Sequence, residues 1–154
     1  MTDSEIEDLR RATASQRDDL LIQLGAYVGL RAFEMPQVRP KDIKETENGQ
    51  YRLHIPSGKD TTGNGGKPRD AFLPASVERD LQRYQNAENI APRDSFINLK
   101  QRGVRAAMKR TAKCAAEETG VEQFRQVSSH DPRRRFAPRL LVDWDMNPPG
   151  VPAV

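Results

Sequence analysis

The sequence predicts a mostly helical α+β domain in which helices surround a small antiparallel β-hairpin sheet. Three observations lead to this class. The chain has 154 residues, which corresponds to one domain with a core of its own. Several long segments repeat apolar residues at helical spacing. Only two short segments alternate apolar and polar residues in the way of half-buried strands.

Two helices are predicted before residue 30. The first covers residues 4–13 and has Ile6 and Leu9 on one side. The second starts after Ser15, a residue type that caps helix N-termini, and ends at Gly29, a residue type that stops helices. Apolar residues repeat at helical spacing within it at Leu20, Leu21, Leu24 and Val28. This second helix is therefore expected in the core.

The middle of the sequence predicts the sheet. A short helical turn over residues 32–37 is followed by an Asn-Gly dipeptide at 48–49, which is typical of turns. Residues 51–55 then alternate as a half-buried strand does, and residues 69–73 are the expected partner. The segment 59–67 between them is rich in glycine, threonine and asparagine, which predicts a long, mobile hairpin tip.

Three more helices are predicted after the sheet. Residues 75–86 and 101–119 have apolar side chains at helical spacing, and Gly120 is expected to end the second of these helices. A last helix over 129–142 would bury its own apolar residues. The proline-rich residues 148–154 are expected to form an irregular tail outside the domain.

Charge is distributed unevenly along the chain. The net charge of +3 is too small to indicate a nucleic-acid partner by itself. Acidic residues concentrate before residue 20, whereas residues 100–139 are rich in cations, and this asymmetry predicts a basic face. The cations are Lys100, Arg102, Arg105, Lys109, Arg110, Lys113, Arg125, Arg133, Arg134, Arg135 and Arg139.

Cysteine content and hydropathy exclude several classes of protein. Cys114 is the only cysteine, so neither an internal disulfide nor a cysteine zinc site is possible, and we expect no cofactor and a reducing, cytoplasmic location. No apolar stretch approaches about 20 residues, and the N-terminal residues do not form a secretion signal. We therefore expect a protein that is neither exported nor inserted in a membrane.

The pair His130 and Arg133 is the most informative feature of the sequence. One helical turn would place both side chains on one face, beside unsatisfied backbone N–H groups, and that arrangement suits a phosphate. Upstream, Arg31 lies at a predicted helix junction and Lys59 in the predicted hairpin. Arginine presents a planar fork to a phosphate, and lysine can donate a proton.

Each of these residues also has a simpler interpretation. Arg31 could form an ion pair with Glu34 three residues later, and Lys59 could be a solvated loop residue. His130 could be an ordinary residue of a first helical turn, and Arg133 part of a solvated basic run. Two nearby cations could equally fill the role of Lys59, namely Lys67 and Arg69.

The ordered set resembles the catalytic domain of tyrosine recombinases, the phage integrase family, over nearly the whole chain. Residues 29–34 match the family's Gly-Leu-Arg-x-x-Glu segment, and Lys59 matches its hairpin lysine. Residues 69–74 are similar to the basic strand and Leu-Pro that follow in the family, and His130 with Arg133 matches its His-x-x-Arg box. The sequence looks most like archaeal integrases.

The resemblance implies catalytic roles for Arg31, Lys59, His130 and Arg133. The two arginines would neutralise a DNA phosphodiester, and the lysine would protonate the leaving 5′-oxygen. His130 would exchange a proton or hydrogen-bond the phosphate. Double-stranded DNA is the expected partner, with intact recombinase subunits as a further one.

The sequence departs from the family at the nucleophile. The sequence has three tyrosines, Tyr27, Tyr51 and Tyr84, and all precede the His-x-x-Arg box in core or strand patterns. We therefore expect residues 1–147 to form a truncated tyrosine recombinase catalytic domain without a nucleophile and without the family's N-terminal DNA clamp. Pro138 adds to this expectation, because a proline within a helix costs ~3 kcal/mol.

Three functions remain open at this stage. The first is a DNA recombination or integration domain that binds and activates a phosphodiester but does not cleave it alone, so that its status as an enzyme is open. The second is a non-catalytic DNA-binding or regulatory module that acts on an intact recombinase. The third is a generic helical domain whose resemblance is historical only.

Overall fold

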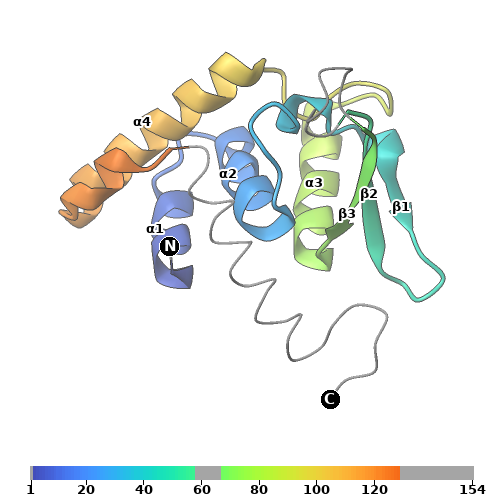
Figure 1. The fold of residues 1–154 in the computed structure, drawn as a ribbon, viewed down its shortest axis with the longest axis horizontal. Helices are drawn as coiled ribbons and strands as arrows, with labels where there is room; N and C mark the ends of the chain where they lie inside the picture. Colours follow the sequence, from blue (N-terminus) through green and yellow to red (C-terminus); the bar gives the residue numbers. More distant parts are fainter. Residues whose placement is uncertain (1, 58–66, 129–154) are drawn as a thin grey trace.

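The computed structural model describes residues 2–57 and 67–128 of the chain (Figure 1). The helices are α1 (Asp3–Arg11), α2 (Gln16–Gln23), α3 (Ala75–Glu88) and α4 (Gln101–Thr119). The strands β1 (Ile43–Glu45), β2 (Tyr51–Ile55) and β3 (Arg69–Leu73) form one antiparallel sheet in that order. Short helical turns cover Leu24–Val28, Met35–Gln37, Pro40–Asp42 and Glu122–Gln126. The predicted class, mostly helical α+β, is confirmed.

The second helix begins and ends with the residue types that the sequence indicates. The hydroxyl of Ser15 accepts a hydrogen bond from the Asp18 backbone N–H at 3.2 Å and caps α2. α2 continues through a π turn over Leu24–Val28 and ends at Gly29, whose φ of 81° lies in the left-handed region that favours glycine. The predicted helix between Ser15 and Gly29 is confirmed, and its apolar residues are buried.

The sheet has one strand more than the predicted hairpin. β2 pairs with β3 as expected, with Tyr51 opposite Leu73 and Ile55 opposite Arg69. The additional strand β1 pairs with the other edge of β2, across the turn that contains Gly49. β1 has only three residues, too few for alternation to be visible in the sequence.

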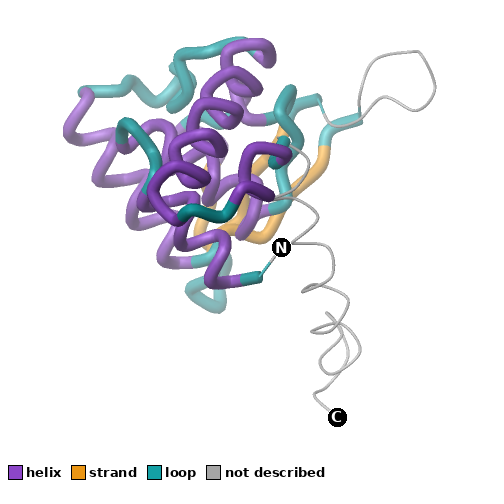
Figure 2. Tube along the Cα trace, turned by 90° about the vertical axis from the view of Figure 1, so that its left-hand side faces the viewer, coloured by secondary structure: helices purple, strands orange, loops and turns teal. Residues whose placement is uncertain are grey.

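The helices cover one face of the sheet. Figure 2 shows the strands on one side of the helical layer, and Figure 1 shows α1, α2 and α3 side by side with α4 lying across α1 and α2. The buried residues on the covered face of the sheet are Leu53, Ile55, Ala71 and Leu73. The opposite face is open to solvent, where Phe72 remains 47% exposed.

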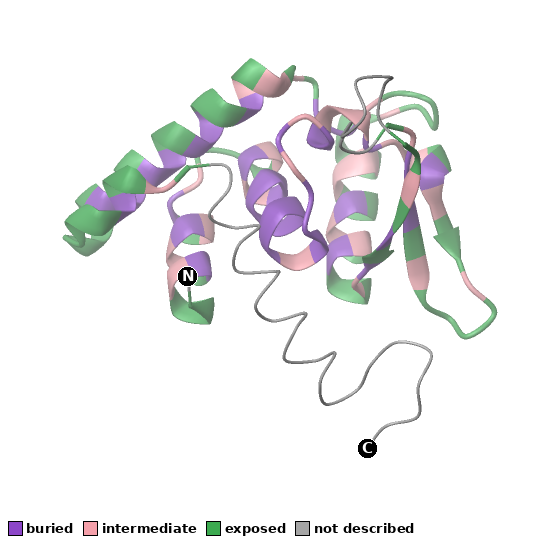
Figure 3. Ribbon diagram, in the orientation of Figure 1, coloured by how far each residue is buried: buried purple, intermediate pink, exposed green. Residues whose placement is uncertain are grey.

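The helix α4 has a buried side and an exposed side. Buried and exposed residues alternate along it with helical period (Figure 3). Its buried side contains Val104, Ala107, Met108, Thr111, Ala112, Ala115 and Ala116. Gly120 ends the helix with a φ of 75°, as predicted. The thiol of Cys114 is exposed on this helix.

The remaining predictions concern three other segments and the absence of a membrane span. The predicted helix over 129–142 and the tail over 148–154 lie outside the described residues, as does most of the hairpin tip at 59–67. Within the part that the structure describes, no helix has both the length and the apolar composition needed to cross a bilayer.

Candidate nucleic-acid interface

Arg31 lies in a tight turn immediately after the end of the second helix. The backbone N–H groups of Gly29 and Leu30 both donate to the carbonyl of Leu24, which closes the π turn. Leu30 is fully buried, and the Arg31 carbonyl accepts hydrogen bonds from the N–H groups of Glu34 and Met35 at 2.9 and 3.2 Å. The backbone of Arg31 is therefore fixed on both sides, while its side chain is half-buried at the surface.

The carboxylate of Glu34 supports this turn from inside the protein. The side chain of Glu34 is fully buried, and its Oε1 accepts the backbone N–H of Arg31 at 2.9 Å. The ion pair between Arg31 and Glu34 that their spacing suggested is not formed among the described residues. Glu34 pairs instead with Arg69 of β3, a residue 35 positions further along the chain.

Arg69 binds Glu34 through two hydrogen bonds. Its Nε donates to Oε2 at 2.8 Å and its Nη2 to Oε1 at 2.9 Å, the bidentate geometry that an arginine offers to a carboxylate. Burial acts to raise the pKa of Glu34, but the hydrogen bonds from Arg69 and from the Arg31 backbone outweigh it and hold that pKa below its usual value. The Arg69 guanidinium is thus engaged by a protein carboxylate, which argues against Arg69 as the substitute for Lys59.

A second group of cations differs from Arg69 because its members keep their charges available. None of them forms an ion pair with a carboxylate within residues 2–57 and 67–128. Exposed cations elsewhere among the described residues are unpaired as well, namely Lys41, Lys44, Arg52, Arg79, Arg83 and Arg93. We use the name available cations for the eight that belong to the Arg31 turn, the hairpin and the basic segment 100–113: Arg31, Lys67, Lys100, Arg102, Arg105, Lys109, Arg110 and Lys113. All of them except Arg31 are exposed. Such unpaired cations can bind phosphates without first breaking an ion pair.

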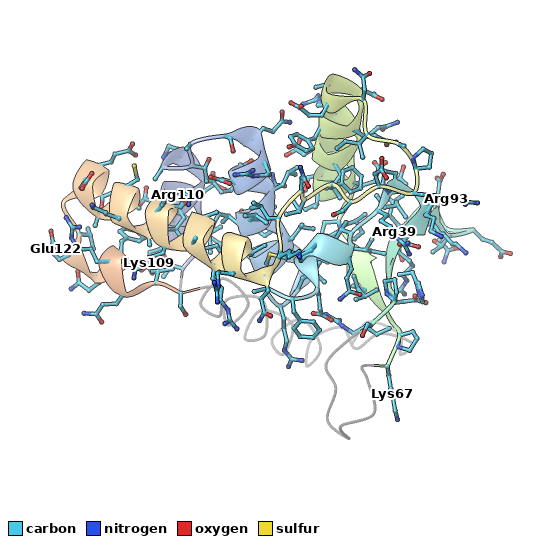
Figure 4. The ribbon with its side chains drawn as sticks, turned by 90° about the horizontal axis from the view of Figure 1, so that it is seen from above. Arg39, Lys67, Arg93, Lys109, Arg110 and Glu122 are labelled. Atoms are coloured by element: carbon cyan, nitrogen blue, oxygen red, sulfur yellow. The ribbon has the colours of Figure 1, made fainter. Side chains whose placement is uncertain are left out.

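The exposed side of α4 carries most of the available cations. In Figure 4, Lys109 and Arg110 project from different sides of α4, and Lys67 extends away from the end of the sheet. Lys109, Arg110 and Lys113 also line a groove between α4 and the short turn Glu122–Gln126, together with Ala106 and Arg125. The described part of the predicted basic face is therefore formed by α4.

The N-terminal end of α4 is suited to an anion. Lys100 occupies the N-cap position without a side-chain hydrogen bond, and the first turn contains no acidic residue. Backbone N–H groups at a helix start attract anions and repel cations, so the placement of Lys100 and Arg102 there favours a bound phosphate. The helix α4 contacts the turn Met35–Gln37, which directly follows the Arg31 turn.

The other predicted site residues lie outside the described residues. Lys59, His130 and Arg133 are in this group, so their convergence with Arg31 stays a prediction. No group of three or more histidine, cysteine, aspartate or glutamate side chains that could hold a metal occurs within residues 2–57 and 67–128. The sequence reasoning missed the link from Glu34 to Arg69, for which the Arg-x-x-Glu spacing gave no signal.

The fold is that of the tyrosine recombinase catalytic core, as comparison with solved structures shows. The XerA recombinase matches with a TM-score of 0.68 and 17% identity over 92% of this chain and 50% of its own. XerH site-specific recombinase bound to difH substrate, in a pre-cleavage complex, matches with a TM-score of 0.63 and 24% identity over 94% of this chain and 42% of its own. The integrase from mycobacterium phage Brujita matches with a TM-score of 0.61 and 19% identity over 90% of this chain and 42% of its own.

These matches extend over most of this chain but only part of the recombinases. The chain spans half or less of the length of each of the three structures. Neither the protein-family models nor the curated proteins give a match to the sequence. The predicted resemblance to tyrosine recombinases is confirmed in the fold.

Proposed function

We propose that this chain is a DNA recombination or integration domain that binds a phosphodiester of duplex DNA through Arg31. One observation carries the proposal: Arg31 lies in a turn fixed by backbone hydrogen bonds, and its guanidinium forms no ion pair within the described residues. The recombinase fold supports it, because one matching structure is XerH bound to its difH substrate.

The turn around Arg31 reduces the cost of binding a phosphate. Its backbone conformation is set before DNA arrives, so only side-chain rotamers remain to be ordered on binding. A guanidinium can bind two phosphate oxygens at once, and partial burial strengthens such hydrogen bonds relative to those in open water. Arg31 thereby acts as the fixed point of the interface.

The available cations of α4 and Lys67 bind further phosphates of the DNA backbone. They are exposed and belong to flexible side-chain types, which suits contacts with phosphates rather than with individual bases. Binding is therefore weakly dependent on sequence and strongly dependent on salt.

In this proposal Lys59, His130 and Arg133 complete the phosphodiester site. Arg133 shares with Arg31 the neutralisation of the charge that develops on the non-bridging oxygens. Lys59 donates a proton to the leaving 5′-oxygen, and His130 exchanges a proton or hydrogen-bonds the phosphate. These four residues activate the phosphodiester but do not attack it.

None of the three tyrosines in the sequence is suited to act as the nucleophile. The hydroxyl of Tyr27 donates to Glu7 at 3.1 Å, and burial raises its pKa. The carboxylates of Glu78 and Glu45 raise the pKa of Tyr51, and negative charge at that position disfavours a phosphate. Tyr84 is half-buried in α3, where burial raises its pKa as well.

The test of DNA binding compares the chain with its Arg31→Ala variant on a labelled duplex at several salt concentrations. We expect salt-dependent binding by the native chain and a loss of about tenfold in affinity for the variant, since a hydrogen bond to a charged group contributes roughly 1.5–3 kcal/mol. Arg83→Ala is the matched control, because Arg83 is an exposed arginine of α3 and loses the same charge. Equal affinities of Arg31→Ala and native chain would contradict the proposal.

The test of strand cleavage uses a nicked duplex that traps a covalent phosphotyrosine product. We expect the 154-residue chain to form no adduct by itself, because activating residues do not replace a nucleophile. An adduct mapped to Tyr27, Tyr51 or Tyr84 would overturn that expectation. Binding to an intact recombinase in the absence of DNA binding would support the regulatory module instead.

A further inference from the structure

The contact between Arg69 and Glu34 connects the sheet to the Arg31 turn. Glu34 Oε1 accepts two hydrogen bonds, one from Arg69 Nη2 and one from the Arg31 backbone N–H, both at 2.9 Å. Its Oε2 accepts a third, from Arg69 Nε at 2.8 Å. The Glu34 side chain is fully buried, whereas that of Arg69 is 38% exposed. All three hydrogen bonds are therefore accepted by one buried carboxylate, two from a charged guanidinium and one from a backbone N–H.

Glu34 is also the acidic residue best placed to capture the Arg31 guanidinium. The two residues are three positions apart in one turn, and the charge of Arg31 already acts on the Glu34 carboxylate. A buried carboxylate without a partner charge is strongly unfavourable and binds the nearest cation. In the absence of Arg69, that cation would be Arg31.

We propose that Arg69 is a positioning residue for Arg31: by saturating Glu34 it leaves the Arg31 guanidinium free for a phosphate. This inference rests on the proposed function of Arg31. Arg69 itself does not bind DNA in this arrangement. Its guanidinium fork is occupied by Glu34, and only the backbone N–H of Arg31 is tied to the same carboxylate.

The test measures the affinity for a labelled DNA duplex in a set of four proteins. Arg69→Ala should lose about tenfold in affinity, because Arg31 then pairs with Glu34. Glu34→Gln sets the reference affinity, since its side-chain carbonyl can still accept the Arg31 N–H but carries no charge that could capture the Arg31 guanidinium. Combining Arg69→Ala with Glu34→Gln should restore affinity to the level of Glu34→Gln alone. Such a restoration would show that the effect of Arg69→Ala depends on the charge of Glu34, the residue that Arg69 and Arg31 share as a partner.

Two competing mechanisms predict different affinities in the same assay. If Arg69 bound a phosphate directly, Glu34→Gln would not restore the affinity lost in Arg69→Ala. If removing any negative charge improved DNA binding, Glu45→Gln would restore Arg69→Ala as well as Glu34→Gln does, since Glu45 is an exposed carboxylate of β1. Either result overturns the inference.

Arg31→Ala, measured in parallel, separates the role of Arg69 from the proposed function. An unchanged affinity in Arg31→Ala would reject the phosphate-binding role itself. A loss in Arg31→Ala without restoration of Arg69→Ala by Glu34→Gln would reject only the role of Arg69. If Arg69→Ala fails to fold in thermal unfolding, Arg69→Lys takes its place. Lysine can still pair with Glu34, but through a point charge and without the bidentate geometry of arginine. We therefore expect a smaller loss of DNA affinity for Arg69→Lys than for Arg69→Ala, and Glu34→Gln should restore it in the same way.

Discussion

The guanidinium of Arg10 binds the carboxylate of Asp19 through hydrogen bonds of 2.8 and 3.2 Å and so joins α1 to α2. Asp19 also accepts a hydrogen bond from Gln23, whose amide donates to Asp80 of α3 as well. Arg10 further lies 5.9 Å from the centre of the Tyr27 ring. The helices α1, α2 and α3 are thus connected by one partly buried polar network.

Arg10→Ala should lower the free energy of unfolding by about 1–3 kcal/mol, because it leaves Asp19 without its charged partner. Urea unfolding followed by circular dichroism measures the change. The neighbouring Arg11→Ala is the matched control: the Arg11 side chain is 70% exposed and pairs with Asp8 on the surface, so its loss should change stability by less than about 0.5 kcal/mol. Equal effects of the two variants would contradict the importance of this network.

Acid should destabilise the fold partly through Glu34. Its pKa in the folded protein is below the ordinary value of 4.5, so its contribution to stability is complete above that value and is lost as the pH falls through the lower, folded pKa. Glu34→Gln should therefore flatten the decline in stability below pH 4.5. Urea unfolding at a series of pH values measures this slope, and Glu45→Gln, which changes an exposed carboxylate, should leave the slope as it is in the native chain.

Gly120→Ala should destabilise the end of α4. Gly120 has a φ of 75° with open space around it, so the cost comes from the backbone conformation rather than from a clash. An expected loss of about 1 kcal/mol follows for alanine, and a smaller loss for Gly120→Asn, because asparagine tolerates the left-handed region. Thermal unfolding of both variants distinguishes this account from a packing defect, which would affect the larger asparagine more.

The cations at the start of α4 should set part of the salt dependence of DNA binding. Replacing Arg102 and Arg105 together by alanine should reduce the slope of log affinity against log salt by about 0.9 for each phosphate that is no longer neutralised. The matched control replaces Arg79 and Arg83, two exposed arginines of α3. A slope that changes equally in both double variants would indicate only a general effect of net charge.

Much of the fold follows from local signals in the sequence. Helix ends are marked by Ser15, Gly29 and Gly120. The serine hydroxyl accepts a free backbone N–H of the first turn, and glycine adopts the left-handed conformation that ends a helix, so both signals act within one helical turn. The pairing of β2 with β3 could be predicted for a similar reason, since apolar and polar residues alternate in both segments and a loop-like segment separates them. Strand β1 was not predicted, because a segment of three residues is too short to show the alternation of apolar and polar residues that indicates a strand.

The site was less accessible from the sequence than the fold. Spacing correctly drew attention to Glu34 beside Arg31, but the guanidinium that Glu34 binds belongs to Arg69 on a strand. Such a pairing depends on how the sheet packs against the turn, and no local periodicity encodes it. Lys59, His130 and Arg133 remain predictions that rest on the family resemblance.

The π turn over Leu24–Val28 determines the rotational phase at which the chain leaves its second helix. Each residue of a helix advances the chain by about 100°, and a π turn holds one residue more than an α turn. Deleting a single residue between Leu24 and Val28 would let this segment close as an ordinary α turn, and the hydrogen bond from the Leu30 N–H to the Leu24 carbonyl would no longer fit. Arg31 would then follow a different turn, so the direction of its proposed phosphate-binding side chain depends on the number of residues in a segment several positions upstream.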